Sequence, residues 1–216
     1  FTPALDFNGV VPTITYTISD GSLTATSTLD LTVRSINDVP VANPDINTTD
    51  EDVVLTVLAA AGLLANDIDA DIDSLSVTQF AVEGITFNAG VTAAFIAGTF
   101  TVNSDGSYTF TPALDFNGVV STITYTTSDG SLTATSTLDL TVSSINDVPV
   151  ANPDINTTDE DSVLTVLAAV GLLANDIDAD MDSLSVTLFA VEGLTYTAGV
   201  TATFVGGTVL VNLDGS

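Results

Sequence analysis

Residues Ser131–Ser143 read SLTATSTLDLTVS, and this stretch decides the class of fold. Its apolar side chains fall mainly on alternate positions, with threonines and one aspartate between them. The apolar set is Leu132, Ala134, Leu138, Leu140 and Val142, and the polar set is Thr133, Thr135, Thr137, Asp139 and Thr141. Because successive side chains of a strand point to opposite faces, the alternation predicts a β-strand with one buried face and one face in water.

The surrounding sequence predicts further short strands separated by tight turns. A strand at Thr122–Thr126 precedes the stretch, and Ser128-Asp129-Gly130-Ser131 forms the turn between them. A second hairpin pairs Thr99–Asn103 with Tyr108–Thr111, because the Asp-Gly between them supplies the positive φ of a tight turn. The remaining elements that we expect are strands at Val53–Leu58 and Leu75–Val82 and one helical turn within Ala59–Ala65. Short strands at this spacing are typical of an antiparallel β-sandwich.

The chain repeats itself with a period of 109 residues. Phe1–Gly9 reads FTPALDFNG and returns at Phe110–Gly118, and of about 107 pairs of positions at that offset roughly 16 differ. A period of this length suits one domain with its own core. We therefore expect three segments: residues 1–40 as the C-terminal part of one module, 41–149 as a complete module, and 150–216 as the N-terminal part of the next.

The charge of the chain is extreme. It has 28 acidic residues and a single basic residue, Arg34, for a formal net charge of −27. Nucleic acid is excluded as a partner because phosphate binding needs clustered Lys and Arg, and anionic membrane surfaces are disfavoured for the same reason. Because hydrophobic residues still make up 45%, we expect a folded core whose charge is balanced by dissolved divalent cations.

The chain lacks the residues that several kinds of chemistry require. The chain has no Cys, no His and no Lys, which removes disulfides, thiolate or imidazole metal sites and the commonest general base. No apolar run is long enough to span a membrane, so we expect no direct membrane insertion. Pairs of carboxylates without an aromatic platform do not resemble a glycosidase site, and we expect no enzyme activity.

One acidic run is the strongest candidate for a metal site. Asn66 is followed by aspartates at every second position, namely Asp67, Asp69, Asp71 and Asp73. The next copy carries Asn175, Asp176, Asp178, Asp180 and Asp182. Hard oxygen ligands at this density suit Ca²⁺. The run is not an EF-hand, because Ile72 stands where that loop needs Gly and Thr78 stands where it needs Glu.

Two further acidic groups flank the joint between modules. Asn37 and Asp38 come just before Pro40, which stiffens the crossing, and Asp50, Glu51 and Asp52 follow early in the next module. Their copies are Asn146, Asp147, Asp159, Glu160 and Asp161. A cation bridging the two sides would fix the angle between modules. The aspartates Asp20, Asp105 and Asp129 lie in Asp-Gly turns, and we interpret them as turn formers.

These motifs resemble bacterial cadherin-like tandem repeats, including the VCBS type, of large RTX-type surface adhesins. The segments that carry the resemblance are LLANDIDADIDSLSV (Leu63–Val77), SDGSYTFTPALDFNG (Ser104–Gly118), ITYTTSDG (Ile123–Gly130) and INDVPVANPD (Ile145–Asp154). The resemblance implies Ig-like or cadherin-like β-sandwiches in an extracellular stalk that Ca²⁺ makes rigid. It also implies that Asn37 and Asp38 join Glu51, Asp67 and Asp69 around a Ca²⁺ between modules.

The leading hypothesis is therefore a structural extender of a secreted or cell-surface adhesin, whose partners are the neighbouring repeats of the same chain. One alternative is a self-assembling surface or matrix filament, in which copies of the chain complete one another by strand addition. The other is a repeated module that binds carbohydrate or ice through its rows of threonine.

Overall fold

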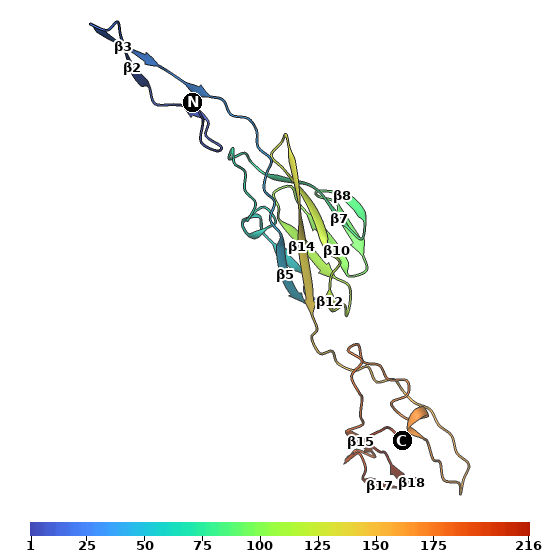
Figure 1. Cartoon of the computed structure of the whole chain (residues 1–216). Coiled ribbons are helices and arrows are strands. Elements are labelled where there is room, and N and C mark those ends of the chain that lie inside the picture. Colours follow the sequence, from blue (N-terminus) through green and yellow to red (C-terminus); the bar gives the residue numbers. More distant parts are fainter. The chain divides into compact units, whose positions relative to one another are not determined.

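The computed structural model describes all residues from Phe1 to Ser216 and is built from β-strands with two short 3₁₀ turns (Figure 1). The all-β prediction is therefore confirmed. The chain divides into two compact units, Phe1–Ser143 and Ser144–Ser216, and each is described by itself. None of its helices is long and apolar enough to cross a membrane.

The first unit contains a complete β-sandwich of two sheets. One sheet has the strand order β6 (Leu55–Val57), β11 (Tyr108–Pro112), β10 (Gly98–Val102) and β9 (Thr92–Phe95). The other has the order β12 (Gly118–Val119), β14 (Thr133–Ser143), β13 (Ile123–Ser128), β7 (Ser76–Val82) and β8 (Ile85–Asn88). All these neighbours are antiparallel, whereas β5 (Asp45–Asp50) lies beside β14 and pairs with it in parallel (Figure 1).

Shorter hairpins and turns make up the rest of both units. In the first unit, β1 (Gly9–Val10) pairs with β4 (Thr32–Val33), and β2 (Ile14–Ser19) pairs with β3 (Thr24–Leu29). The 3₁₀ turn η1 (Ala59–Ala61) falls within the predicted helical turn. The second unit holds η2 (Ala168–Val170), β15 (Leu188–Val191), β16 (Leu194–Thr197), β17 (Thr201–Phe204) and β18 (Gly207–Leu210).

The core lies between the two sheets and follows the predicted alternation in the C-terminal half of β14, whereas Leu132, predicted to be buried, precedes the strand and is exposed. Leu138, Leu140 and Val142 of β14 are buried while the residues between them are exposed. Phe80 of β7 meets Phe100 of β10 edge-on, with ring centroids 5.3 Å apart, and so connects one sheet to the other. Burial of these aromatic side chains and their mutual contacts supply the main stabilisation of the sandwich.

Strand β5 reverses the usual pattern of apolar residues inside and polar residues outside. Its Ile46 is 85% exposed, whereas Asp45 and Asn47 turn inward and are half-buried. The side-chain amide of Asn47 donates a hydrogen bond to the Tyr108 hydroxyl (2.8 Å), and the Tyr125 hydroxyl donates one to the Asp45 carboxylate (2.9 Å). The strand is therefore attached to the core by the hydroxyl groups of two buried tyrosines.

A close backbone contact holds η1 against the β10–β11 turn. The amide of Leu63 donates to the carbonyl oxygen of Gly106 (2.9 Å). A Cβ atom at Gly62 would lie 2.2 Å from that same oxygen, so only glycine fits there. The second unit repeats the contact between Gly171 and Gly215.

We predict that Gly62→Ala destabilises the complete sandwich by roughly 1–3 kcal/mol, because the clash is with backbone that has no side chain to move aside. Denaturant unfolding followed by tyrosine fluorescence measures the loss. The matched control is Ala61→Val, which copies the residue that the next repeat carries at Val170 and is expected to be neutral. Equal stability of Gly62→Ala and wild type would contradict the close contact.

Ile72 has an unfavourable backbone conformation. Its φ is 65°, in the left-handed region, and its side chain is 90% exposed, so no packing compensates for the strain. A β-branched side chain is poorly tolerated at positive φ. The equivalent residue of the next repeat is the unbranched Met181, at a φ of 59°.

We predict that Ile72→Gly raises the unfolding free energy by roughly 1 kcal/mol, because glycine adopts this conformation without a Cβ clash. Ile72→Val keeps the β-branch and is expected to leave the stability unchanged. A melting temperature of Ile72→Gly at or below that of Ile72→Val would show that Ile72 is not strained.

Candidate metal centre at the module ends

The acidic loop, residues 66–73, is wound around one carboxylate. Oδ1 of Asp69 accepts hydrogen bonds from the amides of Asp71 (2.9 Å) and Asp73 (3.1 Å). Oδ2 of Asp69 is buried and accepts no hydrogen bond, whereas Oδ2 of Asp67 is buried and a hydrogen bond from the Thr127 side chain acts to lower the pKa of the Asp67 carboxyl. The alternating aspartates therefore do not lie along one face of an extended strand, because the backbone curls and gives them different environments.

The residues just before β5 anchor this loop. Val41 and Ile68 form an isolated antiparallel bridge. The amide of Asn43 donates to Oδ1 of Asp67 (2.8 Å), and the Asn43 side chain donates to the carbonyl of Asn66 (2.8 Å). These bonds fix the Asp67 carboxylate at the edge of the core.

The linker that precedes the module, residues 35–40, is bonded to the same loop. The hydroxyl of Ser35 donates to one oxygen of Asp71 (2.9 Å), and the amide of Asp38 donates to the other (2.8 Å). Asn37 donates to the carboxylate of Asp129 (2.8 Å). The same Asp129 carboxylate also accepts the amides of its own turn, so its predicted role as a turn former is confirmed.

Burial disfavours the charged form of two carboxylates, that of Asp45 beside the acidic loop and that of Asp67 within it. It raises the pKa of Asp45 to about 6, although the Tyr125 hydroxyl partly offsets the effect. Burial also raises the pKa of Asp67, against the opposing hydrogen bond from the Asn43 amide. A nearby cation would stabilise both carboxylates as anions.

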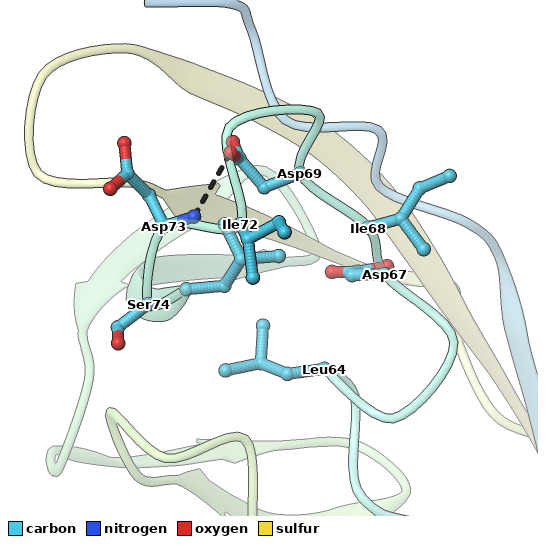
Figure 2. A pocket seen from close by; sticks show the side chains of 8 residues that line it. Leu64, Asp67, Ile68, Asp69, Ile72, Asp73 and Ser74 are labelled. Carbon is cyan, nitrogen blue, oxygen red and sulfur yellow. Dashed lines mark hydrogen bonds between the residues drawn. The ribbon is translucent and has the colours of Figure 1, made fainter. Parts of the chain in front are cut away.

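Two hollows border the acidic loop. One, of about 460 Å³, is lined by carboxylates of the loop and by aliphatic side chains. Figure 2 shows Leu64 and Ile72 on opposite sides of it, with Asp67 at its edge and the Asp73 carboxylate pointing away from Asp67. The second, which we call the joint hollow, has a volume of about 280 Å³. It is lined by Asp6, Phe7, Asn8, Arg34, Ser35, Ile36, Asp38 and Asp71.

A separate acidic group lies at the other end of the sandwich. Glu51 is only 4% exposed; its amide donates to the carbonyl of Ser143 (2.9 Å), and its carboxylate accepts from Asn117 (3.3 Å). The amide of Asp115 donates to Asp52 (3.2 Å), and carboxylate oxygens of these two residues lie within 4.8 Å of each other. Asp50 ends β5 and is exposed.

This placement corrects one expectation. Asn37 is bonded at the turn that precedes β14, whereas Glu51 is bonded to the last residue of β14. The 11-residue strand separates them by roughly 34 Å, at about 3.4 Å per residue. The expectation that Asn37 and Asp38 share one ion with Glu51 is therefore wrong, because β5 runs parallel to the C-terminal part of β14, Leu138–Ser143, and leaves Glu51 at the far end of that strand.

The second unit reproduces the loop and linker contacts. Asp180 accepts from the hydroxyl of Ser144 (3.2 Å) and the amide of Asp147 (2.7 Å), and Asp176 accepts from the amide of Asn152 (2.7 Å). Oδ1 of Asp178 accepts the amide of Asp182 (3.1 Å). The side chain of Asn146 donates to the carbonyl of Asp147 (2.9 Å). The remaining predicted residues of this copy, Asp159, Glu160 and Asp161, are exposed.

The sequence interpretation missed the acidic turn that ends in Asn-Gly. Asp6 and Asp115 occupy the same turn in successive repeats, with φ values of 56° and 54°. Asp6 and Asn8 line the joint hollow, and Asp115 and Asn117 bond Asp52 and Glu51. The available signal was that both repeats carry an aspartate two residues before the Asn-Gly turn.

The residues of these ends fit a hard divalent cation. Their donors are carboxylate, amide and hydroxyl oxygens, which are the ligands that Ca²⁺ prefers. The buried Oδ2 of Asp69, which has no hydrogen-bond partner, is the structural observation that supports the fit, because buried polar atoms are ordinarily satisfied.

Comparison with known proteins gives the family. The profile of the bacterial cadherin-like domain matches residues 37–144, and that of the bacterial Ig domain matches residues 146–216. No curated protein matches the chain.

Several solved structures are similar to it. The endo-fucoidan hydrolase MfFcnA9 from glycoside hydrolase family 107 is 19% identical over 65% of this chain and 23% of its own, with a TM-score of 0.32. The related MfFcnA4 is 18% identical over 64% of this chain and 21% of its own, with a TM-score of 0.33. A chimeric titin Z1Z2 is 15% identical over 61% of this chain and 60% of its own, with a TM-score of 0.28. The chain thus spans about a fifth of the length of these hydrolases.

The cadherin-like match coincides with the complete sandwich, and it begins at the linker residue Asn37 and ends one residue beyond β14. The predicted resemblance to cadherin-like bacterial repeats is confirmed. Because the matched residues make up half of its length, the chain belongs to the family of bacterial cadherin-like domains.

Proposed function

We propose that the chain is a spacer of a secreted or cell-surface bacterial adhesin, in which Ca²⁺ bound at the acidic module ends stiffens the joints. The observation that carries the proposal is the direct attachment of the linker to the acidic loop. Asp71 bonds Ser35 and Asp38, while the same loop holds the buried Oδ2 of Asp69, which has no hydrogen-bond partner, and the half-buried carboxylate of Asp67. Any ligand that orders the loop therefore also orders the linker.

The charges explain why a cation is needed. Without one, carboxylates crowded at the end of a module repel each other, and the formal net charge of −27 adds to the repulsion. A Ca²⁺ ion that binds only the folded loop stabilises it by mass action, by about 2.7 kcal/mol at a hundredfold excess over its Kd. Extracellular modules typically bind Ca²⁺ with Kd values of roughly 10⁻⁴–10⁻³ M.

The proposed partners are neighbouring repeats of the same chain, and we propose no catalytic role. The binding-module alternative has one observation in its favour, a row of threonines across the first sheet, formed by Thr56, Thr109, Thr101 and Thr92. The hydroxyls of Thr92 and Thr101, however, lie 2.8 Å apart and bond each other. The row is thus partly satisfied within the sheet, and the spacer remains the better-supported function.

We predict that millimolar Ca²⁺ raises the melting temperature of the chain by several degrees relative to excess EGTA, because it removes repulsion within the acidic loop. We also predict that Ca²⁺ protects the Arg34–Ser35 bond from trypsin. Arg34 is the only basic residue of the chain, so this bond is its single tryptic site, and it lies beside the joint hollow.

Trypsin activity on a small reporter peptide in the same buffers is the control for effects of Ca²⁺ on the protease. A matching concentration of Mg²⁺ tests whether ionic strength alone explains the protection. Identical melting and cleavage in Ca²⁺ and EGTA would overturn the proposal, because the acidic loop would then be only a solvated surface.

We predict opposite effects of Asp67→Asn on stability with and without the ion. The amide keeps an oxygen for the Asn43 N–H but carries no charge, so the variant is more stable than wild type in EGTA at pH 7, where burial penalises the carboxylate. Its Ca²⁺ affinity falls roughly tenfold or more, because a charged ligand is lost. Isothermal titration and thermal melts measure the two effects.

The matched control is Glu83→Gln, which removes one negative charge from an exposed hairpin residue outside the acidic groups. It is expected to shift Ca²⁺ affinity by less than about twofold, as a screened surface charge does. Equal losses of affinity in the two variants would mean that Ca²⁺ responds only to net charge.

A further inference from the structure

The joint hollow contains the only positive side chain of the molecule. Arg34 follows β4 and lines the hollow together with the carboxylate residues Asp6, Asp38 and Asp71. All these residues lie in one compact unit. Among 28 acidic residues and one basic residue, the single guanidinium thus borders the acidic hollow beside the linker.

The repeat supplies a natural comparison for this position. Of the eight residues that line the joint hollow, seven are identical at the offset of 109. The one difference is Arg34, which is replaced by Ser143. The linker after β4 and the linker after β14 therefore differ in one charge, on an otherwise repeated set of side chains.

We propose that Arg34 is a built-in counter-charge that makes the first joint less dependent on a bound cation than the joint that carries Ser143. This inference rests on the proposed function. The guanidinium attracts the carboxylates of the hollow when no metal is bound, and it repels a divalent cation that enters the same space.

The size of the effect follows from the dimensions of the hollow. A volume of about 280 Å³ corresponds to a sphere roughly 8 Å across. A single and a double positive charge at that separation in water repel each other enough to weaken cation binding roughly fivefold. The repulsion is expected at about 10 mM salt, where the Debye length is about 30 Å, and should shrink at 0.15 M, where it is about 8 Å.

Two backbone amides report on the two linkers separately. The amide of Asp38 is bonded to Asp71 in the first unit, and the amide of Asp147 is bonded to Asp180 in the second. Hydrogen exchange at these amides, followed by NMR during a Ca²⁺ titration of the whole chain, therefore gives an apparent affinity for each linker within one molecule.

For Arg34→Ser at low salt, we expect faster exchange of Asp38 in EGTA and protection at a roughly fivefold lower Ca²⁺ concentration than in wild type. Asp147 should be unchanged. For Ser143→Arg, we expect the reverse shifts at Asp147, with Asp38 unchanged. Arg34→Lys keeps the charge and should behave as wild type at both amides.

The outcomes separate the inference from the proposed function. If Ca²⁺ protects neither amide in any variant, the proposed function fails, and exchange of Asp38 in EGTA still tests the counter-charge. If Ca²⁺ protects both amides but Arg34→Ser changes neither the exchange rate of Asp38 in EGTA nor the Ca²⁺ concentration that protects it, the counter-charge inference is wrong. If Arg34→Ser and Arg34→Lys change exchange equally, Arg34 acts through packing and the inference is wrong.

Discussion

The carboxylate of Asp71 connects the sandwich to its linker, and the rest of the proposed function depends on this connection. One of its oxygens accepts the Ser35 hydroxyl and the other accepts the Asp38 amide, so the linker is held by the acidic loop rather than by apolar packing. Asp180 makes the same two bonds in the next copy. Order in the loop and order in the linker are therefore one property of the molecule.

The core and the acidic ends have separate physical bases. The aromatic contacts around Phe80 and Phe100 stabilise the sandwich by burial and need no ion. The loop instead keeps Asp67 partly buried, at a cost that appears as its raised pKa. A folded sandwich with disordered ends is consequently the expected state of the chain at low divalent cation, and ordered joints are the expected state at high concentration.

The features that sequence could predict are those encoded by neighbouring residues. The alternation of apolar and polar residues predicted β14, the Asp-Gly pairs predicted the hairpin turns, and the aspartates of residues 67–73 predicted the acidic loop. Strand β5 was missed because Asp45 and Asn47 face inward to bond tyrosine hydroxyls, which inverts the pattern that marks a strand. Glu51 was grouped with the wrong joint because proximity in sequence does not reveal that β5 runs parallel to β14.

A difference at position 34 can change a joint without changing the module. Arg34 follows the half-buried Val33 and Ser143 follows Val142, which packs in the core of the sandwich, while Arg34 and Ser143 themselves are exposed. A substitution there adds or removes charge at the linker with no cost in core packing. Under the proposed function, tandem repeats that are nearly identical in their cores would differ in the cation dependence of each joint, and single exposed residues would set the stiffness of such an array joint by joint.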